Sequence, residues 1–313
     1  MVVLEVLERF GHQHFCSGNW SHKQANTYTH GNSRMVVLIY IYTMNKYRKN
    51  RIIYTTLLLV CVVLFWLFDN FYTPAPYSLP EGEGDRTEIP QWLWPSSTTG
   101  EIVQHAHFAL SYNEAYEQAE WVAYVLEKSH LTYDDRKRPL FLEDPKVGSG
   151  SADWRNYKGS GYDRGHLCPA GDRRFSKNAY NETFYTSNIT PQDRDFNGGV
   201  WNRLEQQVRY WAKKDGPLFV VTAGVLERGL PSIGEEDVAV PKYFYKIVAK
   251  GQGENLKIIG FLFPNKESNG KLDQFLVPVD TLEKMTGINF FAGLPDEQED
   301  KLEAGISSSG WRF

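Results

Sequence analysis

The segment SGYDRGHLCPAGDR, residues 160–173, brings together groups that can handle phosphate or a metal ion. A histidine such as His166 has an ordinary pKa of about 6.5 and therefore exchanges protons near neutral pH. A guanidinium such as that of Arg164 can bind phosphate through two parallel hydrogen bonds. A lone histidine in a loop is most often a surface residue, so this segment alone leaves a charged surface turn open as an explanation.

A second polar segment, SNITPQDRDFNGGVWNRLEQQ at residues 187–207, favours a functional site over a charged surface turn. It carries Asn188 and Asn197 ahead of an amphipathic helix that contains Glu205. Either asparagine alone could be a helix cap. Together with the Asp-Arg-Gly-His run, the two segments contain the groups of a one-metal phosphodiesterase: a histidine, amide oxygens, a carboxylate and arginines.

Helical spacing relates Asn197 to Glu205. Eight residues of a continuous helix advance about 12 Å, with a rotation of about 80°. Both side chains are therefore expected on the same half of one helix, too far apart to share the inner shell of one ion.

Taken together, these segments resemble the DNA/RNA non-specific endonucleases, which are relatives of endonuclease G. The resemblance rests on DRGH, SNxxPQ, the following asparagine and WxxLE, and continues through VPKYFYKIV and TGINFFAGLPDEQEDKLE. It covers roughly residues 100–305. It implies the ββα-metal fold, an α+β architecture in which a central, mainly antiparallel sheet is flanked by helices.

The resemblance also implies roles for individual residues. His166 is expected to be the general base, and Asn197 the sole direct protein ligand of Mg²⁺ (or Mn²⁺). Glu205 is expected to hold water molecules of that ion, and Asn188 to support the site by hydrogen bonding. Asp163 is expected to position its loop without reacting.

Arginines are expected where charge develops on the phosphate. The resemblance places Arg164 there together with Arg136 or Arg138, of which Arg138 is favoured. Arg173 and Arg174 are expected either to line the nucleic-acid groove or to lie in a solvated turn.

The implied reaction is hydrolysis of DNA and RNA by water that His166 deprotonates, leaving 5′-phosphate and 3′-hydroxyl ends. Contacts to the phosphate backbone carry no base information, which would explain indifference to sequence. Trp154, Tyr157 and Tyr162 could stack on bases, although core packing is the more common role of such residues. Homodimerisation is also open, because members of this family often dimerise.

Other chemistries fit less well. Cys168 lies two residues after His166, and on an extended segment such residues point to opposite faces, which disfavours a cysteine–histidine dyad. A zinc site at this pair lacks further ligands at a recognisable spacing. The alternative outside enzymology is a membrane-tethered nucleic-acid-binding module that has lost its chemistry.

Bulk properties set the frame for this site. The chain has 313 residues and a formal net charge of −4, so it is not a polybasic protein that coats nucleic acid through charge alone. Its three cysteines are widely separated, which argues against a disulfide framework or a zinc ribbon.

The strongest topological signal precedes the site. Residues 46–51 are rich in Lys and Arg, and residues 52–68 contain no charge. This pattern indicates a signal anchor or a cleaved signal peptide that exports the following domain, leaving it membrane-anchored outside the cytoplasm, or secreted or periplasmic. Residues 1–43 form an extension of uncertain status, because translation could start at Met44.

The remaining organisation follows from composition. Residues 44–71 combine the basic flank with the apolar segment, residues 72–100 form a Pro/Gly-rich linker, and residues 101–313 form the endonuclease domain. β-branched and aromatic runs predict strands at 107–113, 217–226, 240–250 and 256–264. Helices are predicted around 201–211, and from a cap at Asp280 or Thr281 to a stop at Gly287.

Overall fold

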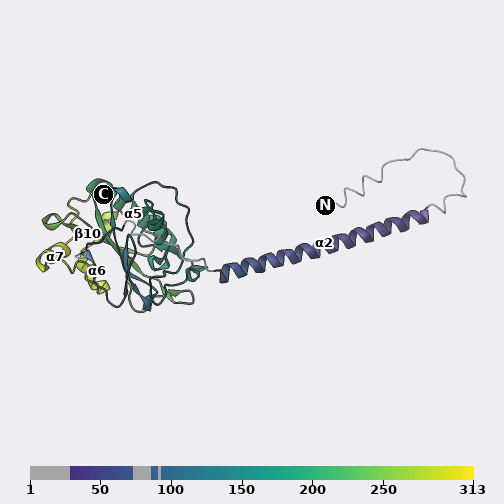
Figure 1. Cartoon of the computed structure of the whole chain (residues 1–313), viewed down its shortest axis with the longest axis horizontal. Coiled ribbons are helices and arrows are strands. Elements are labelled where there is room, and N and C mark those ends of the chain that lie inside the picture. The colour runs from purple at the N-terminus through teal and green to yellow at the C-terminus, as the bar shows by residue number, and fades with distance from the viewer. Residues whose placement is uncertain (1–28, 73–85, 91–92) are drawn as a thin grey trace. The chain divides into compact units, whose positions relative to one another are not determined.

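The computed structural model describes residues 29–72, 86–90 and 93–313. The chain divides into two compact units, Met1–Tyr72 and Thr73–Phe313 (Figure 1). Residues 1–28 of the N-terminal extension and residues 73–85 and 91–92 of the predicted linker lie outside the described residues.

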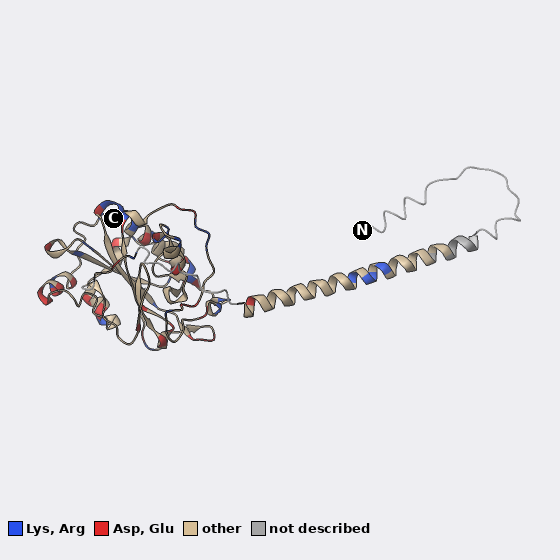
Figure 2. Cartoon of the chain, in the orientation of Figure 1, with Lys and Arg blue, Asp and Glu red and all other residues tan. Residues whose placement is uncertain are grey.

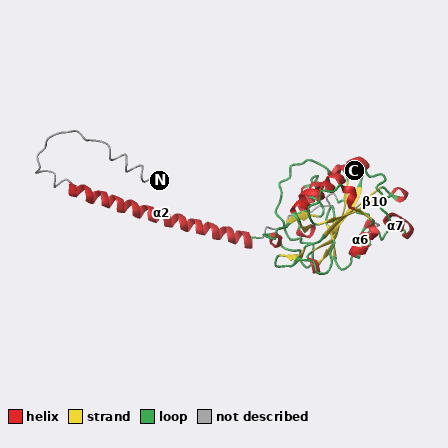
Figure 3. Ribbon diagram, turned by 180° about the vertical axis from the view of Figure 1, so that it is seen from behind, coloured by secondary structure: helices red, strands yellow, loops and turns green. Residues whose placement is uncertain are grey.

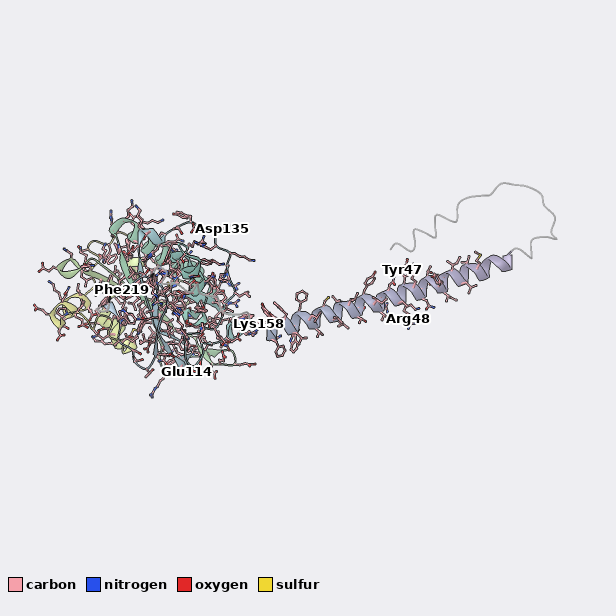
Figure 4. All side chains as sticks on the ribbon, viewed as in Figure 1. Tyr47, Arg48, Glu114, Asp135, Lys158 and Phe219 are labelled. Carbon is pink, nitrogen blue, oxygen red and sulfur yellow. The ribbon has the colours of Figure 1, made fainter. Side chains whose placement is uncertain are left out.

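The described part of the first unit is one helix, α2 (Thr29–Phe71). Its stretch Leu38–Phe71 has a mean hydropathy of 2.3 with no part buried, so it could cross a membrane by length and composition. Figure 2 shows the basic cluster as a blue band within this helix, and Figure 4 shows Tyr47 and Arg48 projecting from it. The 43 residues would extend about 65 Å, about twice the hydrocarbon core of a bilayer. Only part of α2 can therefore lie in that core. The predicted apolar segment, residues 52–68, lies within α2.

The second unit is built on a seven-stranded sheet whose neighbouring strands are all antiparallel (Figure 3). In spatial order the strands are β1 (Glu101–Gln104), β2 (Ala109–Asn113), β3 (Gln118–Leu126), β6 (Leu218–Gly224), β9 (Tyr243–Lys250), β10 (Lys257–Pro264) and β11 (Leu276–Val277).

The four predicted strands are confirmed as β2, β6, β9 and β10. The predicted helix around 201–211 is confirmed as α5 (Asn202–Asp215). The predicted cap at Asp280 or Thr281 is wrong, because α6 (Val279–Thr286) begins after Pro278. Gly287 ends α6 as predicted, with a left-handed φ of 73° that favours glycine.

Helices cover both faces of the sheet. On β10, Phe261 and Phe263 contact Trp211 of α5 and Trp201 just before it. Gly260 directly precedes Phe261 in β10 and faces Leu282 of α6. Because successive residues of a strand point to opposite faces, α5 and α6 lie on opposite sides of the sheet. A further helix, α7 (Asp296–Glu303), packs near α6 and β10.

A buried polar cluster connects the β1–β2 turn to the chain that leads into the site. Asp144 Oδ2 lies 2.8 Å from His105 Nε2 and accepts a 2.5 Å hydrogen bond from Ser187 Oγ. Glu182 accepts a hydrogen bond from the backbone N–H of Ala106. Burial alone would lower the pKa of His105, but the two carboxylates raise it above its ordinary value.

The chain ahead of residue 101 also belongs to this unit. Leu93 is buried in the main core, and the backbone N–H groups of Thr87 and Ser96 donate to Ala106 and Asn289. The folded unit therefore takes in the described C-terminal part of the predicted linker.

Candidate active site

The site is formed by a small ββα unit. Strand β4 (Asp163–His166) pairs antiparallel with β5 (Ile189–Gln192), so that His166 lies opposite Ile189. After β5 come the short helix α4 (Arg194–Phe196), a π-helical turn η7 (Asn197–Trp201) and α5. Both polar segments singled out in the sequence thus meet in one structural unit.

The glycine of the Asp-Arg-Gly-His run is required by close packing. A Cβ at Gly165 would overlap the side chain of Gln192 across the strand pair. Gly165 therefore leaves room for the buried Gln192 side chain, with Arg164 and His166 on either side of it in β4.

Asn188 fixes the chain just beyond His166. Its side-chain amide donates to the carbonyls of Cys168 and Thr183, at 3.0 and 2.9 Å, and its Oδ1 accepts from the N–H of Cys168 at 2.8 Å. Asn188 is fully buried. All three of its bonds go to backbone, which is the pattern of a residue that positions the site.

Asn197 is held by the first residue of β4. Its Nδ2 donates to Asp163 Oδ2 at 3.1 Å. This hydrogen bond leaves Asn197 Oδ1 without a hydrogen-bond partner among the described residues. A neutral amide oxygen is a hard donor of the kind that Mg²⁺ accepts, so the residues present fit a divalent cation here.

The His166 ring lies among aromatic side chains, with ring centroids 4.9 Å from Phe184 and 5.7 Å from Phe141. Its Nε2 is buried and has no hydrogen-bond partner among the residues that the structure describes. Burial, assisted by the charge of Arg138, lowers the pKa of His166 to about 3. The imidazole is therefore neutral at pH 7, the protonation state that a proton acceptor requires, while the low pKa makes it a weaker base than an exposed histidine.

Two arginines lie beside this histidine. The guanidinium carbons of Arg138 and Arg164 lie 5.3 and 5.0 Å from the centre of the Phe141 ring. Arg164 also lies 5.6 Å from the ring of Trp154. Burial and the charge of Arg138 both lower the pKa of Arg164. Two cations held this close attract an anion such as phosphate. Of the two upstream candidates, Arg138 is the one that lies near Phe141 and acts on His166.

Arg136 and Arg174 instead each donate a hydrogen bond to a backbone carbonyl at or near the other residue. Arg136 Nε donates to the carbonyl of Arg174 at 3.0 Å, and its Nη2 lies 2.9 Å from Asp134 Oδ2. Arg174 donates to the carbonyl of Asp134 at 3.3 Å. These bonds close the loop that carries Arg138, near the surface position of Asp135 labelled in Figure 4.

The prediction that Arg173 lines a groove or a solvated turn is wrong. Its side chain is fully buried, and its Nη atoms donate to the carbonyls of Asp172, His107 and Val125. The guanidinium satisfies backbone carbonyls at the end of β3, so no part of it reaches solvent or a substrate.

The chain between Asn197 and Glu205 is not the continuous helix that was expected. Gly199 has non-helical angles, with φ −98° and ψ −109°, so the chain kinks between the two residues. The straight-helix expectation was therefore wrong for this segment. Glu205 is 14% exposed and forms a 3.2 Å ion pair with Arg209, which also lies 2.5 Å from Asp172. Burial raises the pKa of the Glu205 carboxyl.

Sequence reasoning missed a buried lysine beneath this helix. Lys246 of β9 is fully buried, and its Nζ lies 4.6 Å from the centre of the Trp201 ring. None of the described residues forms a hydrogen bond with this Nζ. Burial lowers its pKa to about 8, while Glu205 opposes that shift. The available signal was a lysine inside the apolar strand YFYKIVAK, at a position whose alternation points into the core.

Cys168 takes no part in this chemistry. It is fully buried, and burial raises the pKa of its thiol to about 12. The thiol is therefore not ionised at neutral pH, which agrees with the expectation that it is a small core residue. Tyr157 is likewise buried, whereas Trp154 and Tyr162 are half-buried.

The effect of Arg138 on His166 can be measured directly. In the full chain, Arg138→Gln removes a positive charge beside the imidazole, and we expect the pKa of His166 to rise toward its ordinary value. NMR titration of labelled histidine checks this shift. Lys137→Gln, which removes an exposed positive charge from the same loop, is the matched control and should leave the pKa of His166 unchanged; an equal rise in both variants would contradict the assignment of Arg138.

Comparison with known proteins shows which family this chain resembles. The family model for DNA/RNA non-specific endonucleases matches residues 82–297. Human mitochondrial nuclease EXOG is 36% identical over 234 residues, which cover 69% of this chain and 63% of that relative. The matched segment thus spans less than two thirds of human EXOG.

Two further comparisons agree with this match. Nuclease C1 of Cunninghamella echinulata var. echinulata is 35% identical over 239 residues, covering 68% of this chain and 93% of that protein. A crystal structure of an EndoG/EndoGI complex has a TM-score of 0.59 at 29% identity, covering 64% of this chain and 89% of that one. With its antiparallel sheet, flanking helices and ββα unit, the chain belongs to the DNA/RNA non-specific endonuclease family.

Proposed function

We propose that this protein is a metal-dependent endonuclease that hydrolyses phosphodiester bonds of DNA and RNA without sequence specificity. The observation that supports this most directly is the hydrogen bond from Asn197 to Asp163. It ties a metal-binding amide to the strand that carries the candidate base His166 and the phosphate-binding Arg164.

In this proposal His166 accepts a proton from the attacking water. Its neutral imidazole is suited to that role, and the wall of Phe141 and Phe184 restricts the ring. Arg138 and Arg164 bind the scissile phosphate and stabilise the negative charge that develops on it. The products would carry 5′-phosphate and 3′-hydroxyl ends.

Asn197 would hold the divalent cation directly, and Glu205 would contact it through water. The bound Mg²⁺ (or Mn²⁺) supplies a Lewis acid that stabilises charge on the phosphate and on the leaving oxygen. Arg209, paired with Glu205, orients that carboxyl group and opposes the rise in its pKa that burial causes.

The alternative is a binding module without catalysis. It would keep the arginines and lose the proton acceptor or the metal ligand, yet His166, Asn197 and Glu205 are all present. This combination favours the enzyme. Homodimerisation stays a prediction.

Substitution of His166 distinguishes the proposed enzyme from a binding module without catalysis. His166→Ala in the full chain removes the proton acceptor, and we expect cleavage of plasmid and RNA in Mg²⁺ to fall at least about 100-fold. Binding of DNA should be nearly unchanged, because the arginines remain. EDTA should abolish cleavage by the wild-type protein.

Cys168→Ala is the matched control for this experiment. It removes the neighbouring thiol and should retain cleavage, whereas loss of cleavage in a folded Cys168→Ala protein would revive the dyad. Full activity in His166→Ala would refute the proposed base. Equal activity in EDTA would refute the proposed dependence of cleavage on a metal ion.

We further propose that α2 anchors the nuclease domain in a membrane, with the basic cluster at residues 46–51 on the opposite side from the domain. The apolar helix is consistent with a membrane or signal segment. The EXOG relatives are named as mitochondrial proteins. Export from the cytoplasm would require the same orientation, with the basic cluster on the cytoplasmic side of the membrane and the domain on the other side.

Protease treatment of sealed membrane vesicles tests this topology. In vesicles that keep the cytoplasmic (or matrix) side outward, we expect residues 101–313 to be protected until detergent is added. Recovery of the domain in the soluble fraction after carbonate extraction would indicate a cleaved signal. Digestion of the domain without detergent would contradict the proposed orientation.

A further inference from the structure

Three carboxylates converge between α6 and α7, on the face of the sheet opposite α5. Asp280 and Glu283 lie on α6, and Glu303 is the last residue of α7. One oxygen from each lies within 4.8 Å of the other two. None of these residues belongs to the ββα unit.

Glu303 is the unusual member of this group. Glu303 is only 3% exposed, and within the described part of the chain its buried Oε1 has no hydrogen-bond partner. The charged groups that act on it most strongly are all carboxylates, and burial together with Glu283 raises its pKa to about 8. Other acids nearby, Glu299 and Asp300, add to this repulsion.

The positive groups around the cluster do not offset this charge. Lys284 is exposed and acts on Glu283, whose Oε1 already accepts the N–H of Phe290 at 2.9 Å. Glu303 also lies at the C-terminal end of α7, where the helix dipole disfavours an anion. A buried carboxylate at such a position needs a counter-charge or a proton.

The ligand set of the cluster favours one class of ion. Ca²⁺ takes six to eight oxygen ligands in flexible geometry, whereas Mg²⁺ usually keeps several waters and takes only one or two carboxylates. Three carboxylates whose oxygens lie within 4.8 Å of one another therefore favour Ca²⁺. Asp280 and Glu283 are half-exposed and border an open pocket, which leaves room for water ligands.

From this geometry we propose that Asp280, Glu283 and Glu303 form a Ca²⁺ site that is separate from the catalytic centre. The ion would neutralise Glu303 and join α6 to α7. Leu282 of α6 packs over Gly260 of β10, so the site would secure the helical layer on that face of the sheet. Its function would be to stabilise the fold.

The test uses the full chain in detergent micelles, stripped with EDTA, in an Asn197→Ala background that removes the proposed active-site ligand. Equilibrium dialysis with Ca²⁺ should find one bound ion per chain, which Mg²⁺ at equal concentration does not displace. At 100-fold excess over the Kd, the unfolding temperature should rise by about 5–10 °C.

Glu303→Gln and, separately, Asp280→Asn should each lower the Ca²⁺ affinity and shrink the thermal shift at a fixed Ca²⁺ concentration, because each removes one negative charge from the ligand set. Asp280 is half-exposed, so its variant keeps the buried packing intact if Glu303→Gln fails to fold. Glu254→Gln, which changes an exposed carboxylate elsewhere, should respond like the parent protein. Unchanged Ca²⁺ binding in Asp280→Asn would overturn the site, and equal binding of Mg²⁺ would overturn its assignment to Ca²⁺. Neither measurement uses nuclease activity, so failure here is distinct from failure of the proposed function.

Discussion

The hydrogen bond between Asn197 Nδ2 and Asp163 Oδ2 is the contact on which the site depends. It joins the strand that carries His166 to the helical segment that carries the candidate metal ligand. It also sets which atom of Asn197 is available, because an amide that donates through Nδ2 presents Oδ1 to its other side. The close approach at Gly165 and the backbone bonds of Asn188 hold the strand so that this contact can form.

The electrostatics of the site follow from burial beside fixed cations. Burial of His166, together with the charge of Arg138, favours its proton-free form at neutral pH. Glu205 and Asp172 are both paired with Arg209, and the buried Lys246 also opposes the rise in the pKa of Glu205 that burial causes. The ββα unit and the strand beneath it therefore combine a neutral imidazole with acidic and basic groups that offset one another.

Much of this could be predicted from the sequence, because the strands were long apolar runs and the site residues formed two compact motifs. Strand β3 was missed since its nine residues, QAEWVAYVL, are buried on both faces and show no alternation. The burial of Arg173 could not be foreseen, because the carbonyls it satisfies come from residues far away in the chain. The kink at Gly199 was also missed, since spacing arguments assume a regular helix, as were Lys246 and α7.

The most direct test of this account is the Mn²⁺ affinity of the site in the full chain, measured by EPR as the binding that Asn197→Ala eliminates. Asp163→Ala removes the acceptor that orients the amide, and the affinity should fall about 10- to 100-fold. Arg194→Ala removes the exposed partner of Asp163 and should leave the affinity unchanged. Wild-type Mn²⁺ affinity in Asp163→Ala would contradict the claim that this hydrogen bond forms the site.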